Sequence, residues 1–174
     1  MLSKAFIAIA ALIFSVSLQA QNPLEKLESL IGKWEGTGEG FGNSKSNISA
    51  EYNWLMDRKF IEVKHHSAFA PTAQNSKGEI HDDWGMISFN KERSVVVFRQ
   101  YHSEGFFNEY ILNTAESNDS TLVFETERIE NFVPGGRARF TIRLKAENEI
   151  ETVFDVGFPG KELACFGTNR MKKK

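Results

Sequence analysis

The residues best suited to proton transfer or metal binding are four histidines, at positions 65, 66, 81 and 102. His81 and Asp83 stand two residues apart, so in an extended strand their side chains point to the same side. A carboxylate in that position could orient the imidazole toward a ligand or take part in a metal site. In the same phasing, His65 shares a face with apolar residues and His66 with charged ones. His65 is therefore predicted to face a cavity, whereas the His81 and Asp83 spacing fits a polar pair at a barrel mouth equally well.

A second group of charged residues is placed by one hairpin. If its loop is Ser103-Glu104-Gly105, with the glycine at the positive φ of a three-residue turn, Arg99 faces Glu109 and Tyr101 faces Phe107. Both faces of this hairpin carry apolar side chains, which is typical of a small barrel with a mixed interior.

Arginine side chains inside such a barrel could anchor a carboxylate head group. Arg99, Tyr101 and Glu109 are therefore candidate ligand-binding residues, and Arg139 could join them. The alternative is that these charges lie on the outer, solvated side of their strands.

The elements that would position these residues are short and extended. Asn22, Pro23 and Glu25 form a helix start signal, so residues 23–31 are predicted to form a short helix that ends at Gly32. Period-two patterning then continues to the end of the chain. About ten strands are predicted, at 33–40, 47–55, 59–68, 80–89, 94–102, 106–113, 121–128, 137–145, 149–156 and 162–170.

Such a series predicts an all-β fold, an antiparallel up-and-down β-barrel with a short N-terminal helix, because closure removes the exposed sheet edges. A two-sheet sandwich with a dry core is the alternative. The long loops are expected at 69–79 and 129–136.

The first twenty of the 174 residues read as a secretory signal, with Lys4, an apolar run over 5–18 and a small residue, Ala20. Residues 21–174 then form a single barrel domain, exported to the periplasm or secreted. The apolar run is too short to span a bilayer comfortably, and no membrane insertion is predicted.

The charge balance and cysteine content exclude other classes. The net charge is −2, and loss of Lys4 would make it more negative, which argues against a nucleic-acid partner. The single cysteine, Cys165, allows no internal disulfide. No cysteine or histidine spacing typical of a metal site is present, and the sequence leaves monomer and homodimer open.

The segment Gly32-Lys33-Trp34 and the distant Arg170 form a recognisable pair. They resemble the calycins, which include lipocalins and fatty-acid-binding proteins, where a G-x-W in the first strand is covered by an arginine of the last. The resemblance implies that Arg170 stacks on Trp34 and closes one end of the barrel, a cation–π contact.

The longer runs 30–40 and 81–85, His81-Asp82-Asp83-Trp84-Gly85, look more specifically like nitrobindin-type haem-binding barrels and related lipocalin-like domains of unknown function. That resemblance implies a ten-stranded barrel with haem in a solvent-reachable pocket and an axial histidine in the final strands. The corresponding segment, 162–170, contains no histidine. Cys165 is the residue there that could replace it as an iron ligand.

These observations favour an exported binding protein for a small hydrophobic or fatty-acid-like molecule over an enzyme. The alternatives are a haem protein acting on reactive nitrogen species with a non-standard axial ligand, and a metal-dependent or acid–base enzyme built from His65, His81, Asp82, Asp83 and Glu109. No G-x-S-x-G elbow, P-loop or paired-cysteine site is present.

Overall fold

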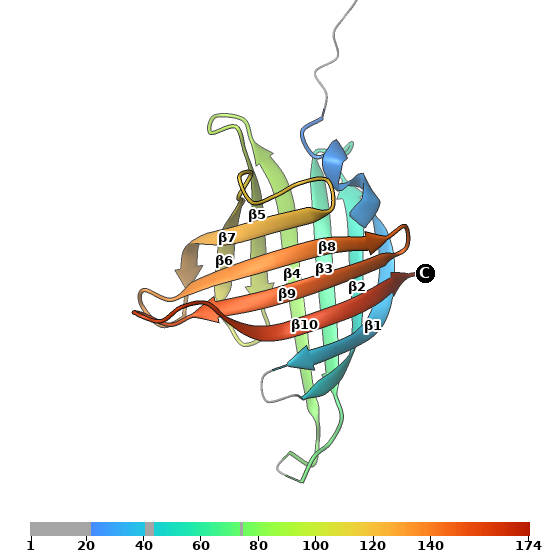
Figure 1. Cartoon of the computed structure of the whole chain (residues 1–174), viewed down its shortest axis with the longest axis vertical. Helices are drawn as coiled ribbons and strands as arrows, with labels where there is room; N and C mark the ends of the chain where they lie inside the picture. Colours follow the sequence, from blue (N-terminus) through green and yellow to red (C-terminus); the bar gives the residue numbers. More distant parts are fainter. Residues whose placement is uncertain (1–21, 41–43, 74) are drawn as a thin grey trace, which may run out of the picture.

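The structure, a computed structural model, describes residues 22–40, 44–73 and 75–174. The predicted signal segment, 1–20, lies outside these residues. All ten expected strands are confirmed (Figure 1), with bounds that differ from the predicted ones by a few residues at most. They are β1 Gly32–Gly40, β2 Lys45–Leu55, β3 Phe60–Phe69, β4 Glu79–Asn90, β5 Val95–His102, β6 Phe107–Leu112, β7 Thr121–Glu130, β8 Arg137–Ala146, β9 Glu149–Gly157 and β10 Ala164–Lys173.

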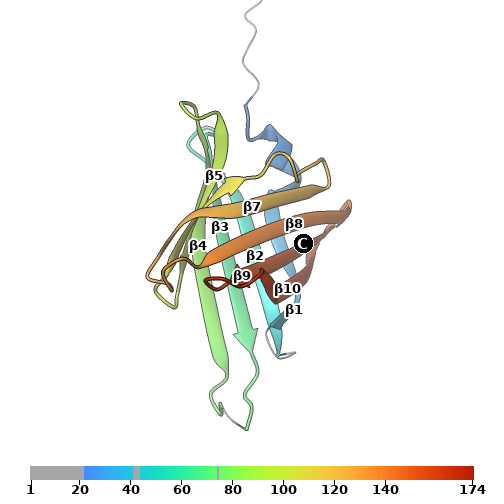
Figure 2. The same cartoon turned by 60° about the vertical axis from the view of Figure 1, so that its left-hand side comes forward.

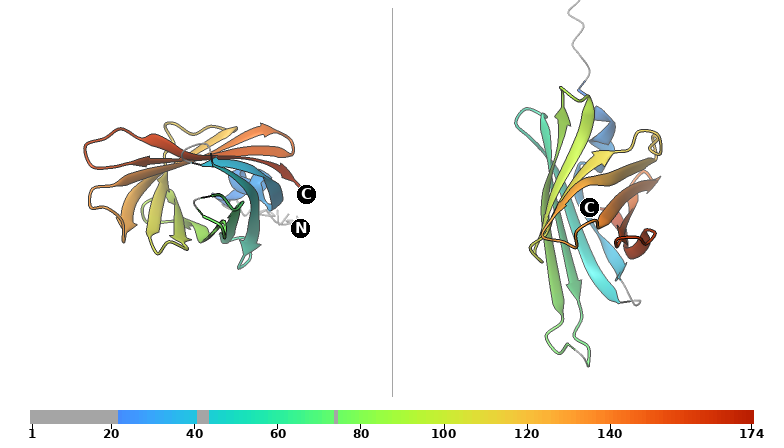
Figure 3. Two further views of the ribbon diagram at one scale, coloured as in Figure 1. Left: turned by 90° about the horizontal axis from the view of Figure 1, so that it is seen from below. Right: turned by 90° about the vertical axis from the view of Figure 1, so that its left-hand side faces the viewer.

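The strands form a closed antiparallel barrel in which each strand pairs with its neighbours in sequence and β1 pairs with β10. Seen from below, they surround a common axis (Figure 3). The barrel is therefore confirmed over the sandwich. The predicted hairpin register is also confirmed, because Arg99 pairs with Glu109 and Tyr101 with Phe107 across β5 and β6. Gly105 takes a φ of 90° in the turn between them, a conformation that glycine adopts readily.

One end of the barrel is covered by a short 3-10 helix, η1 (Glu25–Leu30). The predicted helix is confirmed in position but is shorter and more tightly wound than an α-helix. The predicted cap residue is wrong, because Leu24 precedes the helix directly. Asn22 holds the turn before it, with its side-chain oxygen accepting the N–H of Leu24 at 3.0 Å. The leucines at 24, 27 and 30 are fully buried. The helix therefore seals this end by burying apolar surface.

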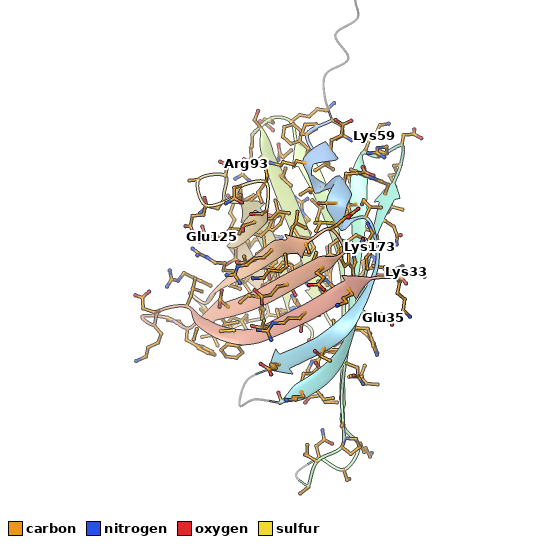
Figure 4. All side chains as sticks on the ribbon, turned by 45° about the vertical axis from the view of Figure 1, so that its right-hand side comes forward. Lys33, Glu35, Lys59, Arg93, Glu125 and Lys173 are labelled. Atoms are coloured by element: carbon orange, nitrogen blue, oxygen red, sulfur yellow. The ribbon has the colours of Figure 1, made fainter. Side chains whose placement is uncertain are left out.

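Trp34 links the helix to the barrel, but the cation that lies over its ring is not the predicted Arg170. The indole N–H donates to the carbonyl of Leu30 at 2.8 Å, and the ammonium of Lys173 lies 5.3 Å from the ring centroid. Lys173 pairs directly with Trp34 across β10 and β1, and Figure 4 labels Lys173 close to Lys33 of β1. The expected stacking of Arg170 on Trp34 is wrong, because alternation along β10 points Arg170 outward.

The outward position of Arg170 is fixed by an ion pair. Its side chain is 65% exposed and binds Glu151 at 3.2 Å, whereas the next residue, Met171, is buried. The arginine therefore belongs to the outer surface, and Lys173 covers the barrel end in its place.

The interior is solid near the helix and hollow at the other end. Rings from four different strands pack together in the solid half, with centroids 5.5 to 6.5 Å apart: Phe98, Tyr110, Phe124 and Phe140. The opposite end, from which the β3–β4 hairpin projects (Figure 2), is called the open end below. Within the described residues, no helix is long and apolar enough to cross a membrane.

Candidate functional site

A cavity of about 790 Å³ occupies the half of the barrel at the open end. Its walls carry aromatic rings from four strands and three loops, and this apolar lining is typical of sites for small organic ligands. The rings are those of Phe69, Phe106, Phe132, Phe140, Phe154, Phe158 and Phe166. Along one wall the rings follow one another, with neighbouring ring centroids 5.9 to 6.2 Å apart, in the order Phe106, Phe132, Phe158 and Phe166.

A row of polar side chains crosses the cavity wall on three neighbouring strands. His65 on β3 pairs with Asp83 on β4, which pairs with His102 on β5. All three line the cavity. Nδ1 of His102 lies 2.8 Å from a carboxylate oxygen of Asp83. The pairing register thus brings together residues 18 or 19 positions apart in the sequence, and it confirms that His65 faces the cavity.

A second polar group lies one step deeper in the barrel. Asn108 on β6 pairs with Gln100 on β5, and its amide contacts Nε2 of His102 at 3.2 Å and the hydroxyl of Tyr110 at 2.7 Å. Gln100 is 3% exposed and Asn108 is 1% exposed. Among the described residues, Oε1 of Gln100 and Oδ1 of Asn108 have no hydrogen-bond partner. Buried polar atoms are almost always paired, so these two oxygens are the groups of the wall that a bound ligand or water would satisfy.

Burial favours the neutral form of His65. Its Nε2 lies 3.1 Å from the hydroxyl of Tyr52, and its ring is 5.7 Å from that of Phe140. Burial lowers the pKa of His65, an effect that Asp83 opposes and His102 reinforces. Burial likewise raises the pKa of Tyr52, because the phenolate would be poorly solvated there.

His81 lies at the rim of the cavity and is held by two carboxylates. Its Nδ1 contacts Glu104 and its Nε2 lies 3.0 Å from Glu79. Burial disfavours its charged form, but Glu104, Glu79 and Asp83 together outweigh that effect and raise the pKa of His81. Although His81 and Asp83 share a face as predicted, Asp83 binds His102 and His81 binds glutamates.

The charged pair predicted as a head-group anchor lies on the outside of the barrel. Arg99 does bind Glu109, at 2.6 Å, but neither residue lines the cavity. Tyr101 is 50% exposed and packs against Phe107. Inward-facing positions on β5 are the even-numbered ones, so alternation places these side chains outward. The expectation that they face a ligand is therefore wrong.

Arg139 is also outside. It binds Glu116 at 3.0 Å and contacts Glu125, which Figure 4 labels on the outer side of β7. Hydrogen bonding to Glu125 raises the pKa of Arg139, and burial opposes this. The guanidinium of Arg139 is paired with these outer glutamates, so it cannot anchor a ligand in the cavity.

The described residues do not fit a haem of the kind that the nitrobindin resemblance implies. Cys165 is exposed, lies outside the cavity lining and has its sulfur 3.5 Å from the hydroxyl of Thr168. Both ring nitrogens of His81 contact carboxylates at the rim, and the final strands, where the resemblance places the axial ligand, contain no histidine. The described lining residues also include no arginine for the haem propionates.

The charge of the cavity lining is mostly negative. Glu39, Glu79, Asp83 and Glu104 are the lining carboxylates, and Lys45 is the one lysine or arginine among the described lining residues. An acidic rim repels anionic ligands and attracts cations. The site is therefore suited to neutral or cationic molecules.

Sequence reasoning missed Gln100, Glu104 and Asn108, and it gave His102 no role. The hairpin register would have placed Gln100 opposite Asn108. Their face of the hairpin also carries Phe98 and Tyr110, but the opposite face is just as apolar. Polar amides on an apolar face are unusual and mark a site.

Neither a protein-family model nor a curated protein matches the chain. Solved structures share its fold. The crystal structure of Rv2717c from M. tuberculosis is 14% identical, with a TM-score of 0.62, over 87% of this chain and 96% of that one. The S-type phycobiliprotein lyase CPES from Guillardia theta is 11% identical, with a TM-score of 0.55, over 89% of this chain and 94% of that one. At these identities, the likeness shows the closed antiparallel β-barrel fold alone.

Proposed function

We propose that this protein is an exported binding protein that holds a small, largely apolar molecule in the open end of its barrel. The observation that carries the proposal is the 790 Å³ aromatic cavity with two buried, unpaired amide oxygens in its wall. Proteins bind drug-sized ligands in cavities of about 300 to 1,000 Å³ with few polar groups. The N-terminal segment supports export, and the likeness to a phycobiliprotein lyase supports a barrel that handles organic molecules.

The polar groups narrow the kind of ligand. Oε1 of Gln100 and Oδ1 of Asn108 accept hydrogen bonds, so a bound molecule that carries an N–H or O–H group would satisfy them. Fatty acids fit poorly, because Arg99 and Arg139 point away from the cavity and the rim is acidic. We therefore infer a neutral or cationic aromatic ligand with a hydrogen-bond donor.

The test is titration of the purified protein with N-phenylnaphthylamine, a neutral aromatic dye whose fluorescence rises in apolar sites. We expect saturable binding by the wild-type protein. Ser67→Trp should abolish it, because Ser67 lines the cavity on β3 and an indole there fills the space that the dye occupies.

The matched control is Ala68→Trp, one residue further along the same strand. Alternation points Ala68 outward, and it does not line the cavity, so this variant should bind the dye like the wild-type protein. Equal loss in both variants, or no saturable binding by the wild-type protein, would refute the proposed function. The anionic dye anilinonaphthalene sulfonate should bind more weakly than the neutral dye.

A further inference from the structure

Three side chains with metal-binding atoms converge at the rim of the cavity. Asp83 on β4, His102 at the end of β5 and Glu104 in the following turn place one ligand atom each within 4.8 Å of one another. Two ligands of one Zn²⁺, each about 2 Å from the ion, lie at most about 4 Å apart. Since Glu104 is exposed, a small movement of its side chain brings the three into coordinating distance.

Neighbouring residues already orient these ligands. Nε2 of His102 is held by Asn108 at 3.2 Å, which leaves Nδ1 directed at Asp83. With a metal on Nδ1, the Nε2–H would donate to the amide oxygen of Asn108 after a half-turn of that amide. His81 supports Glu104. Outer partners of this kind fix the ring and carboxylate orientations in metal sites.

The charge around the cluster favours a bound cation. The charged residues of the described cavity lining include four carboxylates and one lysine, Lys45, so the local field favours positive charge. The buried amide of Asn108 touches His102, and its oxygen has no partner within the described residues. In the turned orientation, that oxygen would accept the Nε2–H of a metal-bound His102.

We propose that Asp83, His102 and Glu104 bind a divalent transition-metal ion of the Zn²⁺ type at the rim of the cavity. One imidazole and two carboxylates suit such ions, and three protein ligands leave a coordination position open. All three residues line the cavity, so water or a donor atom of a bound molecule could complete the shell. The outward pair His66 and Asp82, 2.7 Å apart on β3 and β4, has no third ligand of this kind among the described residues.

The test is isothermal titration calorimetry of the metal-stripped protein with Zn²⁺, without any organic ligand, so that the result is independent of dye binding. We expect one saturable site per chain. Glu104→Gln should weaken binding by at least about tenfold, and since Glu104 is exposed in a turn this variant keeps the fold. Circular dichroism checks this. The control Asp82→Asn removes an equal charge from the outer face of β4 and should bind Zn²⁺ like the wild-type protein.

Co²⁺ in place of Zn²⁺ gives a second readout of the same site. We expect the stronger visible absorption of a Co²⁺ ion with fewer than six ligands in the wild-type protein and its loss in Glu104→Gln. Three results would overturn the proposal: no saturable Zn²⁺ binding, equal weakening by Asp82→Asn and Glu104→Gln, or a Co²⁺ spectrum identical to that of the hydrated ion.

Discussion

Trp34→Ala is expected to lower the free energy of unfolding by about 3 to 5 kcal/mol, the usual cost of removing a large buried aromatic side chain. Trp34 is 1% exposed. Its indole N–H also holds the carbonyl of Leu30, so the variant loses packing and the link between the helix and the barrel. Urea denaturation followed by circular dichroism measures the change.

The control for this prediction is Trp84→Ala. Trp84 is 41% exposed and lies outside the barrel, with its N–H 2.9 Å from Glu62, so its loss should cost about 1 kcal/mol or less. If the two substitutions lowered the free energy of unfolding equally, Trp34 would not stabilise the contact between the helix and the barrel as proposed. Dye binding should survive in Trp34→Ala where the variant is folded, because the cavity lies at the other end.

Gln100→Met is expected to make the protein more stable and a poorer binder. The amide oxygen of Gln100 is buried without a partner, and an unsatisfied polar atom costs about 1 to 3 kcal/mol. Methionine keeps the length of the side chain and removes that cost, so unfolding should require more urea. Affinity for a ligand with an N–H donor should fall by roughly threefold to tenfold, the value of one hydrogen bond.

The neighbouring Arg99→Met is the matched control. Arg99 follows Phe98 on the same strand but points outward to Glu109, so dye affinity should not change. If Gln100→Met lowered the stability, or left dye binding unchanged while Arg99→Met weakened it, the inward face of the hairpin would have been assigned wrongly.

The fold was predictable because its signals are local. Turn residues and period-two patterning located all ten strands, and Gly105 fixed one hairpin register. Closure followed from the number of strands and the need to protect edges. The end of β10 was placed three residues early, at Arg170. The wrong partner for Trp34 came from the calycin resemblance, which implied an arginine in the last strand. The inward side of β10 carries Met171 and Lys173.

The site was only partly predictable because it depends on which face of each strand is inward. His65 was assigned correctly from its apolar companions on β3. On β5 both faces are apolar, so charge drew attention to Arg99 while the amide of Gln100 and the imidazole of His102 went unassigned. The contact between Asp83 and His102 depends on the register between β4 and β5, which no turn signal specified.

The most direct test of ligand binding in the cavity is a nuclear magnetic resonance titration that follows the side-chain amide groups of Gln100 and Asn108 as N-phenylnaphthylamine is added. Both amides line the cavity, so their signals should shift and saturate at the affinity measured by fluorescence. The amide of Asn118, exposed in a turn at the helix end, should not shift. Shifts confined to Asn118 and other surface groups, with Gln100 and Asn108 unchanged, would contradict a ligand site inside the barrel.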